Sequence, residues 1–255
     1  MSQTLLIDLG NTALKWTTAD QPDIPNTLVH RDGLFSKKEL FSQWLQLQPT
    51  QVVGCTVASR QLAFSFTKFF NDHKIPWHWV RASAFYENPN FSLTNHYTTP
   101  TQLGADRWFA ALGAISLVQD APLLVVHAGT ATTVDSIFVD EHKNYHFMGG
   151  RIAPGPTLMR NALLKAVPTL QHQTHPRESF PQSTASAIST GIIDAQIGMI
   201  MHAYYEMIQA KQSPIVLLAG GAAQYIAPTL KKHLPTLQIR HNLVLHGLAL
   251  HTHHE

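Results

Sequence analysis

The chain alternates between short apolar runs and longer segments in which apolar residues return at helical spacing, a pattern typical of an α/β protein. Helical periodicity predicts helices over 36–48, 60–72, 103–118, 156–166 and 186–211, and another from residue 222. Apolar runs predict strands from residues 4 and 13 and over 52–57, 77–80, 123–127, 132–139, 144–148 and 215–218. Turn-forming residues predict loops over 87–101 and 168–183 and a turn at Gly149-Gly150.

An internal similarity divides this series of elements into two halves. Residues 5–12 and 124–131 each contain a short apolar run, a polar residue, a glycine and then small residues, most with a hydroxyl or amide group. A strand-like pattern resumes after each copy, so we predict two lobes of related design, 1–120 and 121–255, joined near Asp120-Ala121-Pro122. A chance likeness between two buried strands is the alternative on this evidence alone.

The first copy, Asp8-Leu9-Gly10-Asn11-Thr12, contains the residue types of a phosphate-binding loop. A glycine lets the backbone approach a phosphate closely, while main-chain N–H groups and amide or hydroxyl side chains donate to its oxygens. Asp8 is a candidate ligand for Mg²⁺, which binds carboxylate, water and phosphate oxygens, and Lys15 adds a point charge. An ordinary Asx-type turn uses the same residues, so the motif alone does not decide.

Two later glycine-containing segments favour the phosphate interpretation. The run Gly129-Thr130-Ala131-Thr132-Thr133 places a second hydroxyl-rich turn after a strand, and two such turns facing each other across a cleft would hold a triphosphate from both sides. Gly220-Gly221-Ala222 follows another apolar strand and is a candidate for close approach to an adenosine. The chain has neither the G-x-x-x-x-G-K-[ST] loop nor the G-x-G-x-x-G loop of protein kinases.

A candidate for acid–base chemistry lies at the start of the apolar helix predicted over 103–118. Asp106 suits a general base, because phosphoryl transfer needs a carboxylate to orient and deprotonate the attacking hydroxyl. Arg107 suits a carboxylate on the substrate, which a guanidinium binds through two parallel hydrogen bonds. The alternative for Asp106 is that it only complements the helix dipole.

Composition narrows the class of protein without indicating a reaction. Charged residues make up 13% of the 255, and the net charge is +2 with the basic residues scattered, which argues against a nucleic-acid-binding protein. Cys55 is the only cysteine, so no disulfide forms within the chain, and we expect it to be a small buried apolar residue. With no signal peptide and no apolar run of membrane-spanning length, we expect a soluble, cytoplasmic protein.

The sixteen histidines invite a search for a metal site. The candidates are His172 and His175 in a loop and His251, His253 and His254 near the C-terminus. None of them has the H-E-x-x-H spacing of a zinc site on a helix, so we do not expect metal binding there.

Four motifs occur in order: 8–12 with Lys15, then 103–108, 129–133 and 149–155. Together they resemble the type III pantothenate kinase family, and the resemblance extends from about residue 4 to residue 250. It implies the duplicated, ribonuclease-H-like α/β fold of acetate kinase, actin and Hsp70, and a homodimer. It also implies ATP-dependent phosphorylation of pantothenate to 4′-phosphopantothenate, the first step of coenzyme A biosynthesis.

The same resemblance implies roles for individual residues. Contacts to ATP would come from Asp8, Leu9, Gly10, Asn11, Thr12, Ala13, Leu14, Lys15 and Thr130, with Mg²⁺ at Asp8 held directly or through water. Asp106 would be the catalytic base for the pantothenate hydroxyl. The pantothenate pocket would be lined by Tyr97, Gly104, Ala105, Asp106, Arg107 and Thr184.

One position departs from the family pattern. Many members carry an aspartate two residues before the glycine of the second loop, where it helps to bind K⁺ or NH₄⁺, and this chain has His127 there. Because K⁺ prefers oxygen ligands, an imidazole is a poor substitute, and a monovalent cation would need main-chain carbonyls or other oxygens. The alternative is that His127 is a core histidine.

Two other functions remain open at this stage. One is a kinase of the same fold that acts on a sugar or another acid, and the other is a non-catalytic, nucleotide-binding regulatory homologue. The presence of Asp8, Asp106 and Arg107 favours an enzyme, because a binding module has no need for a base.

Overall fold

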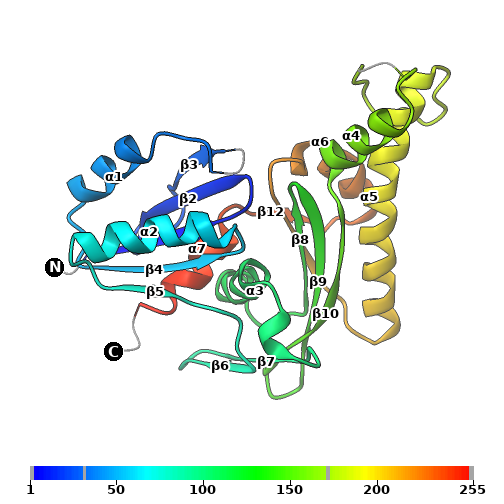
Figure 1. Ribbon diagram of the computed structural model, residues 1–255. Coiled ribbons are helices and arrows are strands. Elements are labelled where there is room, and N and C mark those ends of the chain that lie inside the picture. The colour runs from blue at the N-terminus through cyan, green and yellow to red at the C-terminus, as the bar shows by residue number, and fades with distance from the viewer. Residues whose placement is uncertain (1–2, 31–32, 171–172, 253–255) are drawn as a thin grey trace. The chain divides into compact units, whose positions relative to one another are not determined.

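The computed structural model describes residues 3–30, 33–170 and 173–252, which divide into two compact units (Figure 1). Unit 1 contains residues 1–119 and 242–255, and unit 2 contains residues 120–241. The predicted second lobe includes 242–255, whereas the structure groups this segment with unit 1. The reason is a close helix contact: a Cβ atom on Gly247 of α7 (Leu243–Ala249) would clash with the carbonyl oxygen of Phe109 in α3 (Ala105–Leu117).

Unit 1 has strands β1 (Thr4–Leu9), β2 (Ala13–Thr18), β3 (Asn26–Val29), β4 (Gln51–Thr56), β5 (Trp77–Trp79), β6 (Phe85–Glu87) and β7 (Ser92–Asn95). Its helices, besides α3 and α7, are α1 (Lys37–Gln46), α2 (Arg60–Asp72) and the 3-10 helix η1 (Pro100–Gln102). Unit 2 has β8 (Leu123–Ala128), β9 (Ala131–Val139), β10 (Tyr145–Pro154), β11 (Ile215–Ala219), β12 (Gln238–Ile239), α4 (Pro156–Ala166), α5 (Thr184–Gln209) and α6 (Ala223–His233). No helix in the described ranges is long and apolar enough to cross a membrane.

The main sheet of unit 1 has the strand order β3-β2-β1-β4-β5. Strand β1 pairs antiparallel with β2 and parallel with β4, so it lies at the centre of the sheet. Its apolar residues are fully buried, and Trp44 of α1 and Phe66 and Phe70 of α2 pack in the same core cluster. This burial fixes the register of β1 and therefore the place where its polar end emerges.

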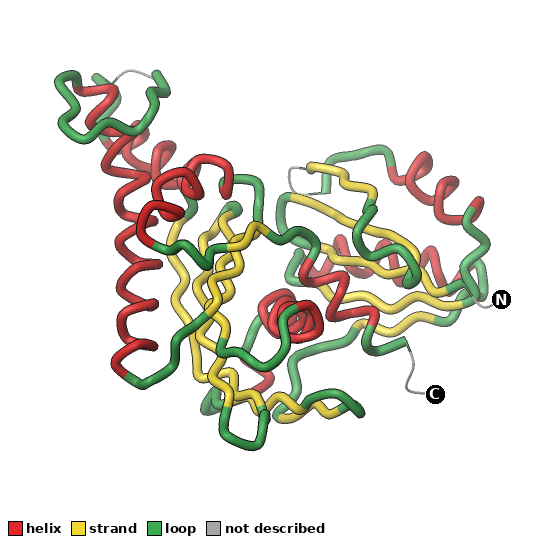
Figure 2. The backbone as a smooth tube through the Cα atoms, turned by 180° about the vertical axis from the view of Figure 1, so that it is seen from behind, coloured by secondary structure: helices red, strands yellow, loops and turns green. Residues whose placement is uncertain are grey.

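Unit 2 repeats this topology. Its strands lie in the order β10-β9-β8-β11-β12, with β8 antiparallel to β9 and parallel to β11. Helices α5 and α6 share one core cluster with β8 and β11, and Figure 2 shows α5 running along the strands of this unit. Each unit thus carries the same five-stranded pattern, which confirms the duplication that the two similar sequence segments predict.

Every predicted helix and strand is present, but three details differ from the prediction. Gly149-Gly150 is not a turn, because β10 continues through both residues with a bulge after Phe147, and Gly149 has φ +138°. The predicted loop 87–101 contains β7 and η1. Strands β3, β6 and β12 and helix α7 were not predicted, since segments of 4, 3, 2 and 7 residues give little periodicity.

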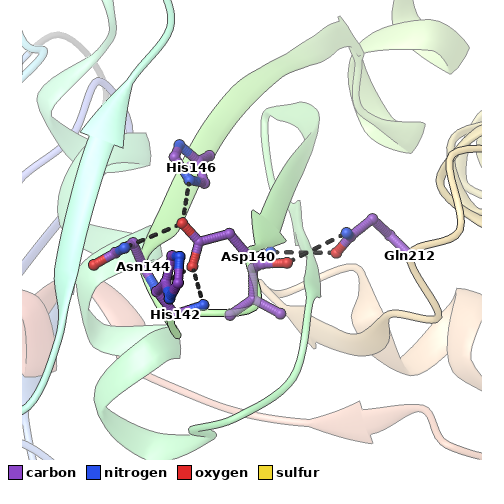
Figure 3. Close-up of polar contacts among 6 residues, drawn as sticks. Asp140, His142, Asn144, His146 and Gln212 are labelled. Carbon is purple, nitrogen blue, oxygen red and sulfur yellow. Dashed lines mark hydrogen bonds and ion pairs between the residues drawn. The ribbon is translucent and has the colours of Figure 1, made fainter.

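The hairpin between β9 and β10 is fixed by a polar network (Figure 3). The Asp140 carboxylate accepts a hydrogen bond from the Asn144 main-chain N–H at 2.8 Å and lies 3.5 Å from Nε2 of His146. Hydrogen bonds from the Asn144 side chain and its neighbours lower the pKa of Asp140 to about 2. Gln212, in the segment between α5 and β11, pairs with both main-chain groups of Val139 at 3.2 and 3.3 Å. The network anchors the hairpin to the end of α5.

Candidate active site

The turn between β1 and β2 forms the predicted phosphate loop. The main-chain N–H of Gly10 donates to the carbonyl of Ala13 at 2.9 Å, which closes the turn. The side chains of Asn11 and Thr12 are exposed beyond it. The N–H of His30 donates to the Thr12 carbonyl at 2.8 Å, so the segment after β3 supports the loop from one side. Two amide- or hydroxyl-bearing side chains are therefore presented to solvent by a fixed backbone.

Asp8 lies beside this loop at the centre of the sheet. Its neighbours across the ladder are Lys15 on β2 and Cys55 on β4, and side chains of paired residues share a face of the sheet. Burial raises the pKa of Asp8 from 3.8 to about 7, the Lys15 ammonium opposes this rise, and the carboxylate of Asp106 adds to it. Asp8 and Asp106 are thus close enough to interact, although 98 residues separate them in the sequence.

Cys55 is buried, with 1% of its surface exposed, as the sequence analysis expected. Its Sγ atom lies 4.0 Å from Oδ1 of Asp8. Burial, together with the carboxylates of Asp8 and Asp106, raises the pKa of the thiol well above its ordinary value. Cys55 is therefore a neutral thiol and a weak hydrogen-bond donor to Asp8, not a nucleophile.

Helix α3 presents the second carboxylate. Gly104 is its N-cap residue, and Oδ1 of Asp106, in the first turn, accepts the main-chain N–H of Arg107 at 2.9 Å. Among the described residues, no hydrogen bond engages Oδ2 of Asp106. This oxygen is available to accept a hydrogen bond from a hydroxyl group.

Arg107 is buried, and its guanidinium is held by Tyr97. The Nη1 group donates to the Tyr97 hydroxyl at 2.8 Å, and Cζ lies 5.7 Å from the centre of the tyrosine ring. The exposed fraction of Arg107 is only 6%, and a charge-assisted pair with a carboxylate is stronger where water is largely excluded. Four residues that the sequence singled out lie in unit 1: Asp8 interacts with Asp106, and Arg107, the neighbour of Asp106, contacts Tyr97.

Unit 2 holds the second predicted loop. The N–H of Gly129 donates to the carbonyl of Ala131 at 3.0 Å, and the exposed Thr130 lies at the tip. The ends of two other strands meet this turn. Gly155 donates to the Thr130 carbonyl at 2.8 Å, and Gly220, with φ +95°, lies so close to Ala128 that a Cβ would clash with its backbone. The structure therefore gathers three predicted glycine segments at one edge of the sheet.

His127 and Thr184 also lie in unit 2. His127 is exposed, which rules out the alternative that it is a core histidine. It is paired in the sheet with Thr133 on β9 and Ala219 on β11. Thr184 is the exposed first residue of α5, after the N-cap Ser183.

The oxygen ligands in unit 1 fit a bound Mg²⁺. Asp8 offers a carboxylate next to the predicted phosphate loop, and Mg²⁺ in kinases is held by one or two carboxylates, water and phosphate oxygens. Within the described ranges, no group of three or more His, Cys, Asp or Glu side chains is arranged to hold a metal ion. His172, His253 and His254 lie outside the described residues, so the sequence prediction about them stays a prediction.

Asn242 contacts Lys15 of the predicted phosphate loop, and no sequence pattern singled it out. Its Oδ1 atom accepts a hydrogen bond from Nζ of Lys15 at 3.4 Å, across 227 residues of sequence. No local pattern links the two residues. The only signal is an asparagine at the start of the last helix, which is typical of an ordinary N-cap.

Comparisons with known proteins identify relatives along nearly the whole chain. A family model described as type III pantothenate kinase matches residues 4–206. The type III pantothenate kinase of Nitrosomonas eutropha (strain DSM 101675 / C91 / Nm57) is 36% identical over 255 residues, covering 96% of this chain and 93% of that protein.

Two solved structures show the fold. A Campylobacter jejuni protein assigned to the Baf family of transcriptional activators has a TM-score of 0.55 and 19% identity, covering 96% of this chain and 94% of that one. A non-polymerisable quadruple mutant of pCBH ParM has a TM-score of 0.50 and 12% identity, with 99% of each chain covered. At these identities the likeness concerns the fold alone, and it confirms the duplicated actin-like architecture.

Proposed function

Because this chain belongs to the type III pantothenate kinase family, whose members phosphorylate pantothenate with ATP, we propose that the Asp8–Asp106–Arg107 constellation of unit 1 carries out this reaction. The observation that supports the assignment is the gathering of two interacting carboxylates beside a phosphate-type loop. One carboxylate adjoins a lysine and the other adjoins a buried arginine.

In this proposal the β1–β2 loop, residues 8–15, binds the phosphates of ATP, with Thr130 as a further contact from unit 2. Mg²⁺ at Asp8 would offset the negative charge that develops on the phosphate oxygens. The Lys15 ammonium adds a positive charge on the same face of the sheet. The raised pKa of Asp8 is consistent with this role, since a partly buried carboxylate without a cation is costly and favours cation binding.

Asp106 is the proposed base, and Arg107 the proposed carboxylate anchor. Oδ2 of Asp106 accepts the proton of the pantothenate primary hydroxyl. The hydroxyl oxygen forms a bond to the γ-phosphorus of ATP, and the bond between that phosphorus and the ADP oxygen breaks. Arg107, held by Tyr97, binds the pantothenate carboxylate. Gly104, Ala105 and Thr184 are proposed as the remaining contacts to the substrate.

The anchor can be tested with an uncharged substrate analogue. In pantothenol an alcohol replaces the carboxylate, so we expect wild-type protein to prefer pantothenate by 10-fold or more in kcat/KM. Arg107→Gln should lose most of this preference, because an amide makes no charge-assisted pair. Equal preference in the two proteins would remove Arg107 as the anchor. Arg81→Gln, at an exposed position of unit 1, is the control for a general loss of charge.

We further propose that turnover does not depend on a monovalent cation bound by the side chain at position 127. An exposed imidazole supplies no oxygen to K⁺. We expect similar rates in K⁺ and Na⁺ for wild type, and a gain of K⁺ stimulation in His127→Asp. Strong K⁺ activation of the wild type would show that other oxygens bind the ion.

A homodimer and a cytoplasmic location complete the proposal. Exposed apolar side chains on neighbouring elements of unit 2 support the dimer: Met148 and Ile152 of β10 are 44% and 64% exposed, and Tyr205 of α5 is 56% exposed. They flank an ion pair between Arg151 and Glu206. Light scattering after gel filtration should give twice the 28.4 kDa chain mass, and Ile152→Asp should shift the protein toward the monomer. A monomeric wild type would refute the dimer.

A further inference from the structure

The C-terminal segment of unit 1, which begins at residue 242, contacts Lys15, the lysine proposed to bind the nucleotide phosphates. Asn242 is the first residue of that segment, and its side-chain oxygen lies 3.4 Å from Nζ of Lys15. Lys15 is paired across the ladder with Asp8, so its ammonium has a carboxylate neighbour on β1 and an amide neighbour from the far end of the chain.

Asn242 is itself held in place. Its backbone has φ +59°, in the left-handed region, which asparagine enters at lower cost than most residues. Its side-chain amide donates to the carbonyl of Asp23 at 3.3 Å. The carboxylate of the same Asp23 lies 2.9 Å from Nε2 of His246, one turn further along α7. Backbone conformation and two hydrogen-bonding partners therefore fix the direction of the Asn242 side chain.

The ordinary role of an asparagine at this position is absent. Asn242 is the N-cap residue of α7, where a side-chain oxygen usually accepts a main-chain N–H of the first turn, yet it makes no such bond. Its oxygen contacts Lys15 instead. A capping function thus does not account for the side chain.

We propose that Asn242 is a positioning residue that holds the Lys15 ammonium in place for the nucleotide phosphates. The inference rests on the phosphate-binding role proposed for Lys15. A neutral amide oxygen restricts the lysine without adding a second negative charge beside it, so its positive charge stays available to the phosphates. A carboxylate at position 242 would restrict Lys15 equally well but would neutralise it.

The test is direct binding of Mg²⁺ with the non-hydrolysable analogue AMPPNP, measured by calorimetry, so that it does not depend on the identity of the phosphate acceptor. Asn242→Gly keeps the left-handed backbone and removes the oxygen, and we expect roughly 3- to 10-fold weaker binding, the scale of one hydrogen bond to a charged group. KM for ATP should rise in parallel, with kcat and KM for pantothenate within about 2-fold. Lys74→Gly, at another left-handed residue of unit 1 with φ +56°, is the matched control and should bind normally.

A double variant separates positioning from general stability. If Asn242 acts through Lys15, Asn242→Gly should add nothing to Lys15→Met, whereas a merely structural role would weaken both backgrounds equally. Asn242→Asp, which also tolerates the left-handed region, should bind at least as weakly as Asn242→Gly. Wild-type affinity in Asn242→Gly or Asn242→Asp, or additive losses in the double variant, would overturn the inference. Wild-type affinity in Lys15→Met would refute the phosphate role of Lys15 and the inference with it. Turnover of pantothenate is measured separately, because it tests the proposed function and not the role of Asn242.

Discussion

The carboxyl group of Asp8 is expected to make the protein less stable as the pH rises, and Asp8→Asn should remove this effect. Burial raises the pKa of Asp8 from 3.8 to about 7 in the folded protein, an effect that Lys15 reduces and Asp106 increases. In the unfolded chain the group has its ordinary pKa, so below pH 7 the folded state binds more protons than the unfolded state. Linkage then requires the free energy of unfolding to fall as the pH rises from about 4 to about 7.

The size of the effect follows from the two pKa values. Each pKa unit corresponds to about 1.4 kcal/mol, so the raised pKa lowers the free energy of unfolding by roughly 4 kcal/mol above pH 7. At pH 5 the loss is about 1.5 kcal/mol, because the group is still protonated in the folded protein but largely ionised in the unfolded chain. Residual solvent access at Asp8 screens part of this cost. Asn has nearly the same shape and no charge. We therefore expect Asp8→Asn to be the more stable protein, with a gain that grows by about 2–3 kcal/mol between pH 5 and pH 8.

Urea denaturation of the nucleotide-free protein at pH 5, 6, 7 and 8 measures this difference. Asp20→Asn, at an exposed position of the same unit, is the control and should change the free energy of unfolding little at every pH. Asp8→Asn should also lower kcat at least 100-fold, because the carboxylate that destabilises the folded protein is the group proposed to hold Mg²⁺. A gain that is absent, or equal at pH 5 and pH 8, would refute the reasoning.

Three further substitutions test other parts of the structure. Asp106→Asn should bind AMPPNP like the wild type but lower kcat by about 10²- to 10⁴-fold, and an unchanged kcat would remove Asp106 as the base. Gly155→Ala should lower the free energy of unfolding by several kcal/mol in urea denaturation, because its Cβ would clash with the carbonyl oxygen of Gly129; full stability would mean that this turn yields easily. Gly198→Ala, within α5 with nothing near its added Cβ, should instead stabilise the protein by about 0.5–1 kcal/mol. A lower free energy of unfolding would mean that the space around this Cβ is occupied.

The chemistry proposed for the site follows largely from local sequence. Asp8 and Lys15 sit on either side of a tight turn between strands, so the hairpin itself brings them opposite each other. Asp106 and Arg107 begin an apolar helix, where a polar pair is conspicuous. Local sequence does not predict that Asp8 and Asp106 interact, because this interaction depends on how α3 packs in unit 1.

The missed features arise from long-range contacts or from very short elements. Residues 242–255 belong to unit 1 because a glycine of α7 allows a backbone contact with α3, and a seven-residue helix carries no signal of its partner. The Lys15–Asn242 bond is another such contact. Gly149-Gly150 was predicted to be a turn because the two glycines favour one, whereas pairing with β9 holds them in a strand.

Transfer of a phosphoryl group from ATP to pantothenate by Asp8, Asp106 and Arg107 can be tested directly. Purified protein with Mg²⁺ and ATP should be supplied with pantothenate, other hydroxy acids or hexoses, in K⁺ or in Na⁺, and the products identified by mass spectrometry. We expect 4′-phosphopantothenate and ADP in equal amounts, with little product from the other acceptors and similar rates in the two salts. Phosphorylation of a sugar, with no phosphopantothenate formed in either salt, would contradict it.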